Sequence, residues 1–358
     1  MTLLSFCSLI VLLFSIQFAI SIDSNATKAK QIVLPVGILS TGSEYDDSVR
    51  YVNISFGTPP QLLPISFTFG SASTDMYYEQ TRGLCSTSWT NDHYFDSQKS
   101  STFDLYSNTS DPDLSYARDR LQLISAEDSS QVLVLNNFSV VMEKTYDSGS
   151  CYPATGILGM GRFQSSIRHV VDELEESVIT IAPPRADDSE DLTMVLTLGG
   201  ADTKRCADKW VWRDCSLEYK DIYPLCPFSS LEFQFGKYST VGGAVVTPDS
   251  GMLFVPSDVM GWIERTLDYD YIWGGIPCDG ITFPDLVYTL DDLEFRINGS
   301  YYVGDPLYTH PGYCDLNIED SDEWGLSVSF TLPAIFLEQN CQIISYANDT
   351  TAFAYGLL

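Results

Sequence analysis

Short runs of residues with the two-residue period of a β-strand occupy most of this chain. Gly, Pro, Asn and Asp, which favour turns, separate these runs. In chain order they include YVNISFG, LLPISFTFG, SQVLVL, FSVVME, MVLTLGG, LEFQFG, GAVVT, LEFRING, GLSVSF, CQIISYA and TAFAYG. This pattern predicts an all-β fold built from many short strands.

Helical patterns are sparse and limited to two segments. The first covers residues 166–177, and the second covers residues 258–267, with Ser257 as a candidate N-cap. In the first segment, one helical face would carry Ile167, Val170, Val171 and Leu174. We therefore expect a few short helices packed against a β-sheet core.

The amino terminus has the features of a secretory signal. Residues 1–21 carry no charged side chain and end in small residues, Ala19 and Ser21, which predicts a signal peptide cleaved before Ile22. A membrane anchor is the alternative, although the apolar run is short for a span. Six Asn-X-Ser/Thr sequons fit secretion and are the expected glycosylation sites: Asn25, Asn53, Asn108, Asn137, Asn298 and Asn348.

The cysteines point to the same compartment. Of nine cysteines, only Cys7 lies in the signal segment, so the mature chain keeps an even number. None forms a C-x-x-C motif, and the three histidines are scattered, so we expect disulfides and no metal site. The chain is therefore expected to be secreted, or to occupy an acidic lumen of the secretory and endosomal pathway.

The charge of the chain limits its partners. There are 19 Lys and Arg against 48 Asp and Glu, a formal net charge of −29. Such a chain is not a nucleic-acid binder, since phosphates are bound by clustered cations, and an anionic membrane would repel it. Disorder is excluded because 44% of the residues are hydrophobic, enough for a large core.

Two loops, one in each half of the chain, have a similar sequence pattern. SFTFGSAS at residues 66–73 and VVTPDSGM at residues 245–252 both lead an apolar strand into a loop of small polar residues. They lie about half the mature chain apart, which suggests two similar lobes with a cleft between them. Chance similarity of short strings is the alternative explanation.

An ordered series of motifs runs through residues 50–358. It comprises FGTPPQ, SSTF, ATGILGMGR, LTLGGAD and the closing segment SFTLPAIFLEQNCQIISYANDTTAFA. The series resembles the pepsin-like aspartic protease family (peptidase A1 type). That resemblance implies a bilobal double β-barrel with an interlobe cleft. The lobes would span residues 51–200 and 201–358, after a segment at 22–50 that is too short for a full prosegment.

The resemblance also implies one catalytic aspartate from each lobe, in an Asp-Thr/Ser-Gly loop. Two adjacent carboxylates share one proton, as aspartic proteases exemplify, so that one acts as base and the other as acid. In this chain Thr68 stands at the first aspartate position, and a threonine hydroxyl cannot act as that base. Asp75 is expected to lie past the loop.

The second loop allows two alignments. Asp249 begins an Asp-Ser-Gly motif, but pairing it with the family's loop requires a gap. An ungapped pairing places Thr247 at the aspartate position. In the closing segment Pro333-Ala334 replaces the family's Gly-Asp. On either alignment at least one catalytic aspartate is missing.

The resemblance assigns further residues around the cleft. Gly70 and Ser71 follow Thr68 in the first loop, and Tyr116 falls where the flap tyrosine would sit. The flap segment at residues 116–118 lacks the glycines that let a hairpin tip bend. These residues are expected to contact a bound peptide.

The resemblance implies a disulfide between Cys278 and Cys314. A second, local disulfide is expected between Cys206 and Cys215. The partners of the other cysteines are left open: Cys85, Cys151, Cys226 and Cys341.

The leading hypothesis is a secreted, glycosylated pseudoenzyme that binds a peptide or protein in its cleft. An active aspartic endopeptidase using Asp249 is the alternative, and a structural or storage glycoprotein is a third possibility. We expect a monomer with no cofactor, no nucleic-acid partner and no stable membrane insertion.

Overall fold

The structure is a computed structural model. It describes residues 29–39, 49–68, 73–77, 94–108, 114–143, 154–161, 166–188, 192–219, 223–226, 228, 230–233, 236–239, 244–247, 252–279, 283–322 and 330–357. Several positions singled out above lie outside these residues: the signal segment, Asn25, Gly70, Ser71, Cys85, Cys151 and Asp249.

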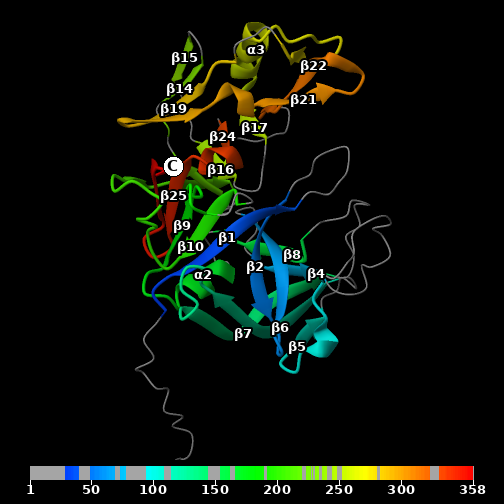
Figure 1. Cartoon of the computed structure of the whole chain (residues 1–358), viewed down its shortest axis with the longest axis vertical. Coiled ribbons are helices and arrows are strands. Elements are labelled where there is room, and N and C mark those ends of the chain that lie inside the picture. Colours follow the sequence, from blue (N-terminus) through cyan, green and yellow to red (C-terminus); the bar gives the residue numbers. More distant parts are fainter. Residues whose placement is uncertain are drawn as a thin grey trace, which may run out of the picture.

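The first lobe is a β-barrel (Figure 1). Its strands, in sheet order, are β2 (Val49–Phe56), β3 (Gln61–Thr68), β8 (Gly156–Gly159), β4 (Asp75–Tyr77), β7 (Val132–Glu143), β6 (Leu114–Ile124) and β5 (Asp104–Asn108). A further pairing of β2 with β6 closes the barrel. Apolar residues alternate along these strands and fill the interior, as at Ile54, Phe56, Ile65 and Phe67.

A central sheet joins the two ends of the chain. Its strands, in order, are β11 (Val211–Arg213), β26 (Thr350–Tyr355), β25 (Asn340–Ser345), β9 (Val178–Ala182), β10 (Met194–Leu198) and β1 (Ile32–Leu39). Figure 1 shows the C-terminal β25 beside β9. Because β1 pairs with β10 and also with β2, the central sheet continues into the barrel of the first lobe.

The second lobe consists of several small sheets. One contains β12 (Ser216–Tyr219), β13 (Tyr223–Cys226), β16 (Ala244–Thr247) and β24 (Phe330–Pro333). A second contains β15 (Gly236–Ser239), β14 (Ser230–Phe233), β19 (Leu286–Leu290) and β20 (Leu293–Ile297). The others contain β17 (Leu253–Val255), β23 (Ile318–Asp320), β18 (Ile276–Pro277), β22 (His310–Leu316) and β21 (Val303–Leu307). The predicted all-β, two-lobed architecture is confirmed.

The helices are short, and both predicted segments need correction. The helix predicted over residues 166–177 is α2 (Ser166–Val171), because i→i+3 hydrogen bonds replace the helical ones at Leu174 and the amide of Glu175 donates to Ala29 instead. Its predicted apolar face is nevertheless buried: Ile167, Val170, Val171 and Leu174.

In the second predicted segment, α3 (Ser257–Thr266), Pro256 occupies the N-cap position. Ser257 is therefore the first helical residue, not the cap, and its hydroxyl donates to the carboxylate of Asp322. The remaining α-helix in the described chain is α4 (Ala334–Leu337), which follows β24 directly.

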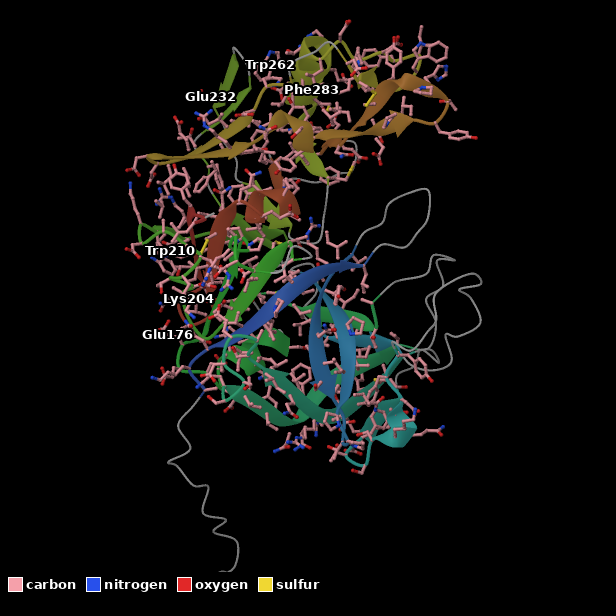
Figure 2. The ribbon with its side chains drawn as sticks, viewed as in Figure 1. Glu176, Lys204, Trp210, Glu232, Trp262 and Phe283 are labelled. Carbon is pink, nitrogen blue, oxygen red and sulfur yellow. A yellow bond between two sulfur atoms is a disulfide. The ribbon has the colours of Figure 1, made fainter. Side chains whose placement is uncertain are left out.

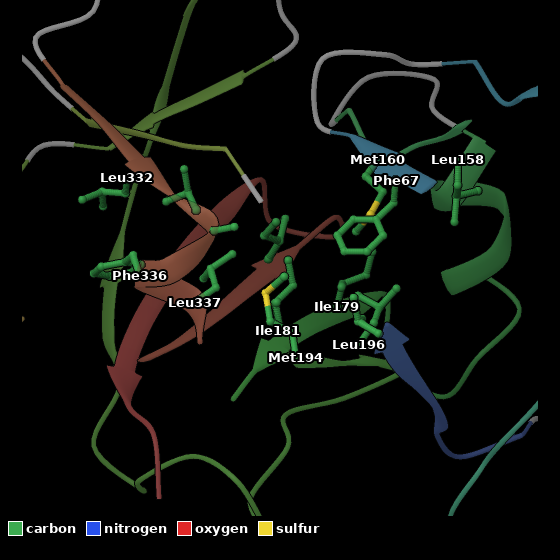
Figure 3. Packing of buried hydrophobic residues seen from close by; sticks show 14 of the residues in the cluster. Phe67, Leu158, Met160, Ile179, Ile181, Met194, Leu196, Leu332, Phe336 and Leu337 are labelled. Carbon is green, nitrogen blue, oxygen red and sulfur yellow. The ribbon is translucent and has the colours of Figure 1, made fainter. Parts of the chain in front are cut away.

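One hydrophobic core runs through both lobes. Figure 2 shows the described side chains on the ribbon of both lobes. Figure 3 shows the central part of this core, where Ile181 of the central sheet lies between Phe67 of β3 on one side and Phe336 of α4 on the other. All three side chains are almost completely buried, so the end of β3 and α4 pack against the same sheet.

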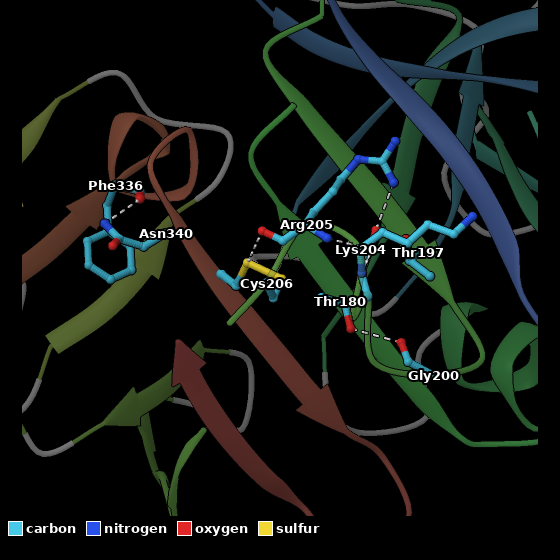
Figure 4. The surroundings of a disulfide bond; sticks show 10 residues. Thr180, Thr197, Gly200, Lys204, Arg205, Cys206, Phe336 and Asn340 are labelled. Atoms are coloured by element: carbon cyan, nitrogen blue, oxygen red, sulfur yellow. Dashed lines mark hydrogen bonds and ion pairs between the residues drawn. A yellow bond between two sulfur atoms is a disulfide. The ribbon is translucent and has the colours of Figure 1, made fainter. Parts of the chain in front are cut away.

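Three disulfides are present in the described chain: Cys278–Cys314, Cys206–Cys341 and Cys215–Cys226. The first is the one implied by the family resemblance. The predicted Cys206–Cys215 pair is wrong, because β11 runs along β26 between these two residues and separates them. Cys206 instead lies at the end of β26, beside the Cys341 of β25 (Figure 4).

Candidate active site

Two strands end in threonine with the same pairing pattern. In the first lobe, β3 runs parallel to β8, and Thr68 lies opposite Gly159. In the second lobe, β16 runs parallel to β24, and Thr247 lies opposite Pro333. The two similar segments noted in the sequence, at residues 66–73 and 245–252, therefore each contain the end of a strand that pairs in parallel with its neighbour.

The residue before each threonine is an anchor in the core. Phe67 is 1% exposed and Val246 is 0% exposed. Since side chains alternate along a strand, Thr68 points away from the core side that Phe67 occupies, and it is half-buried. The carbonyl oxygen of Thr68 accepts a hydrogen bond of 2.8 Å from the amide of Met160, which continues the parallel pairing past Gly159.

Directly opposite residues in a sheet place their side chains on the same face. Ser66 lies two residues before Thr68, and the strand registers extend from it as one row across five strands, from β3 to β6. We call it the Ser66 row, and its members are Ser66, Ile157, Asp75, Val141 and Tyr116. Exposure rises along the row from 3% at Ser66 to 43% at Tyr116. Thr68 therefore shares a face with Asp75 and Tyr116.

Asp75 lies past the first loop, as expected from its position in the sequence. It begins β4, and β8 separates β4 from β3. Its side chain is half-buried, and this burial raises the pKa of its carboxyl, while a 2.9 Å hydrogen bond donated by the Ser73 hydroxyl opposes the increase. The Asp75 carboxyl therefore lies on β4, two strands away from β3, and not at the end of β3 where Thr68 lies.

Tyr116 occupies a different local structure from the one expected. The segment at residues 116–118 was expected at a hairpin tip, but it lies within β6 and pairs with β5 on one side and β7 on the other. The residues between β5 and β6, 109–113, lie outside the described residues. The tyrosine remains on the outer face of the barrel, where it is accessible.

A second tyrosine, which sequence reasoning missed, stacks on Tyr116. The ring centroids of Tyr106 and Tyr116 are 6.2 Å apart with an interplanar angle of 28°. The guanidinium of Arg118 lies 4.3 Å from the centre of the Tyr106 ring, within range of a cation–π interaction. The register shift between Leu105 and Ser107 brings Tyr106 to this face, and no signal in the sequence marks that shift.

These aromatic residues line a hollow of ≈ 880 Å³. One wall is formed by the outer face of β7 and β6, with Ser139 and Arg118, and another by His169 on α2. Ser73 and Thr74, just past the first loop, complete its edge. The hollow therefore extends the face that Thr68 shares, and it combines aromatic with hydrogen-bonding side chains.

Neither a metal centre nor a membrane span is found in the described part of the chain. There, no group of three or more His, Cys, Asp or Glu side chains is arranged to hold a metal ion. Within the same residues, every helix falls short of the length and apolar character that crossing a bilayer requires.

A family model described as "Eukaryotic aspartyl protease" matches residues 50–355. The chain belongs to this family. "Aspartic protease 17" of Caenorhabditis elegans is 23% identical over 359 residues, covering 93% of this chain and 88% of the relative. "Aspartic protease 1" of the same organism is 24% identical over 339 residues, covering 87% and 83%. The resemblance inferred from the ordered motifs is confirmed.

Proposed function

We propose that this aspartyl protease homologue is a secreted pseudoenzyme that binds a peptide or protein segment without hydrolysing it. The observation that supports this best is the matched register of β3 with β8 and of β16 with β24. This register supports Thr68 and Thr247 as counterparts of each other, at the strand ends where the family's mechanism needs two aspartates.

The chemistry explains why this substitution matters. The family's reaction uses one ionised carboxylate to take a proton from water and one protonated carboxyl to polarise the peptide carbonyl. A threonine hydroxyl does neither at acidic or neutral pH. Removing one member of a catalytic unit lowers turnover by roughly 10⁴- to 10⁶-fold, so a chain without both carboxylates would retain no useful peptidase activity.

Asp249 defines the alternative, an active endopeptidase. It follows Thr247 by two residues and begins an Asp-Ser-Gly motif. The parallel pairing favours Thr247 as the counterpart of Thr68, because it is the residue of β16 opposite Pro333, just as Thr68 is opposite Gly159. Even if Asp249 took the catalytic place, it would lack a partner carboxyl at Thr68.

Peptide binding does not depend on the missing carboxylates. Extended peptides are held by backbone hydrogen bonds and by pockets for alternate side chains. The family binds peptide substrates in its cleft, and the Ser66 row supplies the accessible Tyr116 on the face that Thr68 shares. This combination favours a binding protein, such as an inhibitor or a decoy, over a purely structural glycoprotein.

Secretion is supported by three independent features: the apolar amino terminus, the disulfides and the accessibility of the sequons. Disulfides form and persist in oxidising compartments. Four sequon asparagines in the described chain are exposed: Asn53, Asn137, Asn298 and Asn348.

A hydrolysis assay tests the proposal. The purified protein, a Thr68→Ala variant and an Asp249→Asn variant are incubated with denatured haemoglobin or casein across acidic pH, with and without pepstatin. We expect no pepstatin-sensitive cleavage by any of the three. Pepstatin-sensitive cleavage that is lost in Asp249→Asn would establish the active alternative.

A further inference from the structure

The hollow beside α2 contains one of the sequons. Asn137 and Ser139 lie on β7, both are exposed, and both line the hollow, whereas Phe138 between them is 5% exposed and points into the core. Asn137 has a left-handed backbone conformation, with φ of 66°, next to the register shift between Asp119 and Leu121. Asn137, the residue that would carry the sugar, therefore lines a hollow and does not lie on a flat surface.

The walls of the hollow have the chemistry that holds a sugar. The stacked pair Tyr106 and Tyr116 offers an aromatic surface, and each ring is 43% exposed. Around this pair lie hydrogen-bonding groups from Arg118 on β6, from His169 on α2 and from Asp172, the residue after α2. An apolar sugar face packs against aromatic rings, while its hydroxyls bond to a few well-placed polar groups.

The distances suit an oligosaccharide attached at Asn137. Val141, four residues further along β7, lies directly opposite Tyr116. At a rise of about 3.4 Å per residue this separates the acceptor from the aromatic pair by about 14 Å. The first sugars of an N-linked glycan bridge such a length, whereas a single sugar does not.

We propose that Asn137 carries an N-linked glycan whose first sugars lie in this hollow against Tyr106 and Tyr116. The inference rests on the secretory location in the proposed function, because only that pathway attaches such a glycan. The glycan then competes with a bound peptide for Tyr116, on the face continuous with Thr68. It therefore limits which peptides reach this end of the Ser66 row.

Site-resolved deglycosylation tests the proposal. The protein is secreted from a eukaryotic host and treated under native conditions with peptide-N-glycosidase, and glycopeptide mass spectrometry follows each site over time. If the Asn137 glycan lies in the hollow about nine-tenths of the time, its release is slowed about tenfold. We expect that delay relative to the glycans at Asn298 and Asn348, which are exposed.

Two variants make the result specific. A double variant, Tyr106→Ser with Tyr116→Ser, removes the aromatic surface, and we expect release at Asn137 to become as fast as at Asn298. Tyr308→Ser is the matched control, because Tyr308 is 99% exposed and belongs to the second lobe, so release at Asn137 should stay slow.

Three results would overturn the inference. The first is equally fast release from Asn137 and Asn298 in the unmodified chain, and the second is slow release that the double variant leaves unchanged. The third is an Asn137 without sugar while Asn298 and Asn348 carry it. Absence of sugar from every sequon would instead contradict the secretory location, and with it both proposals.

Discussion

A buried arginine beside the central sheet supports a strong prediction. The Arg205 side chain is 4% exposed and contacts three carboxylates from separate segments. Its guanidinium lies 2.7 Å from Glu127, in the turn between β6 and β7, and 3.1 Å from both Asp188 and Asp202. The next residue, Cys206 (Figure 4), forms the disulfide to Cys341. The Arg205 cluster and this disulfide therefore tie the turn between β6 and β7 to the C-terminal strands.

Replacing Arg205 by methionine keeps the apolar stem but removes the charge. The carboxylate of Asp202, on a residue 5% exposed, is then left buried without its cation. Breaking a buried ion pair by removing one partner costs about 3–5 kcal/mol, so we expect Arg205→Met to lower the free energy of unfolding by that amount at neutral pH. Arg296→Met is the matched control, because the pair of Arg296 with Glu294 is exposed and such pairs contribute about 0–1 kcal/mol.

The loss should depend on pH. Burial raises the pKa of Glu127, but hydrogen bonds from Lys204 and Arg205 outweigh it and hold the pKa below its ordinary value of 4.5. A carboxyl whose pKa is lowered by folding contributes stability above its unfolded pKa and loses it as the pH falls through its folded pKa. The difference between wild type and Arg205→Met should therefore be largest at neutral pH and shrink below the ordinary carboxyl range.

Urea titrations of the wild type, Arg205→Met and Arg296→Met at neutral and strongly acidic pH measure these differences in the free energy of unfolding. Two outcomes refute the reasoning. One is an Arg205→Met variant that is no less stable at neutral pH than Arg296→Met. The other is a difference that stays constant, or grows, as the pH falls.

Three further predictions concern the scaffold. The Cys206–Cys341 disulfide closes a loop of 135 residues, so the variant with both cysteines changed to alanine should lose about 5 kcal/mol in a urea titration, and an unchanged midpoint would contradict this. A Cβ at Gly156 would lie 2.1 Å from the carbonyl oxygen of Asp75, so Gly156→Ala should displace β4 and cost about 1–3 kcal/mol, visible as a lower melting temperature. Phe336 is 0% exposed and packs against Phe295 of β20 and Phe353 of β26. Phe336→Ala should therefore cost about 3–5 kcal/mol in the same melting experiment, and a loss under 1 kcal/mol would show that the site collapses.

The fold class could be predicted from local pattern, whereas long-range pairing could not. Alternating runs are a property of neighbouring residues, and they predicted the strands. The partner of Cys206 depends on how β11 pairs with β26, at the far end of the chain, and no local spacing encodes that. Likewise α2 is shorter than its apolar pattern because the amide of Glu175 bonds to Ala29, a contact made only in the folded chain.

The same contrast between local pattern and long-range pairing applies to the candidate site. Thr68 could be found because ordered motifs surround it. The sequence leaves two alignments of the second loop open, because only the parallel register of β16 with β24 relates Thr247 to Thr68. The sequence pattern does not predict β6, because its buried residues include Ser115 and Asp119, and these polar side chains break the apolar alternation of a strand.

The central claim is that this chain holds peptides without hydrolysing them, and isotope incorporation tests it most directly. Hydrolysis by water places one water oxygen in each new carboxyl terminus. The protein is incubated at acidic pH with a mixture of synthetic peptides in water enriched in the heavy oxygen isotope, and mass spectrometry detects labelled termini. We predict no more label than with the Thr68→Ala variant. Labelled termini that exceed this level and disappear with pepstatin would contradict the account.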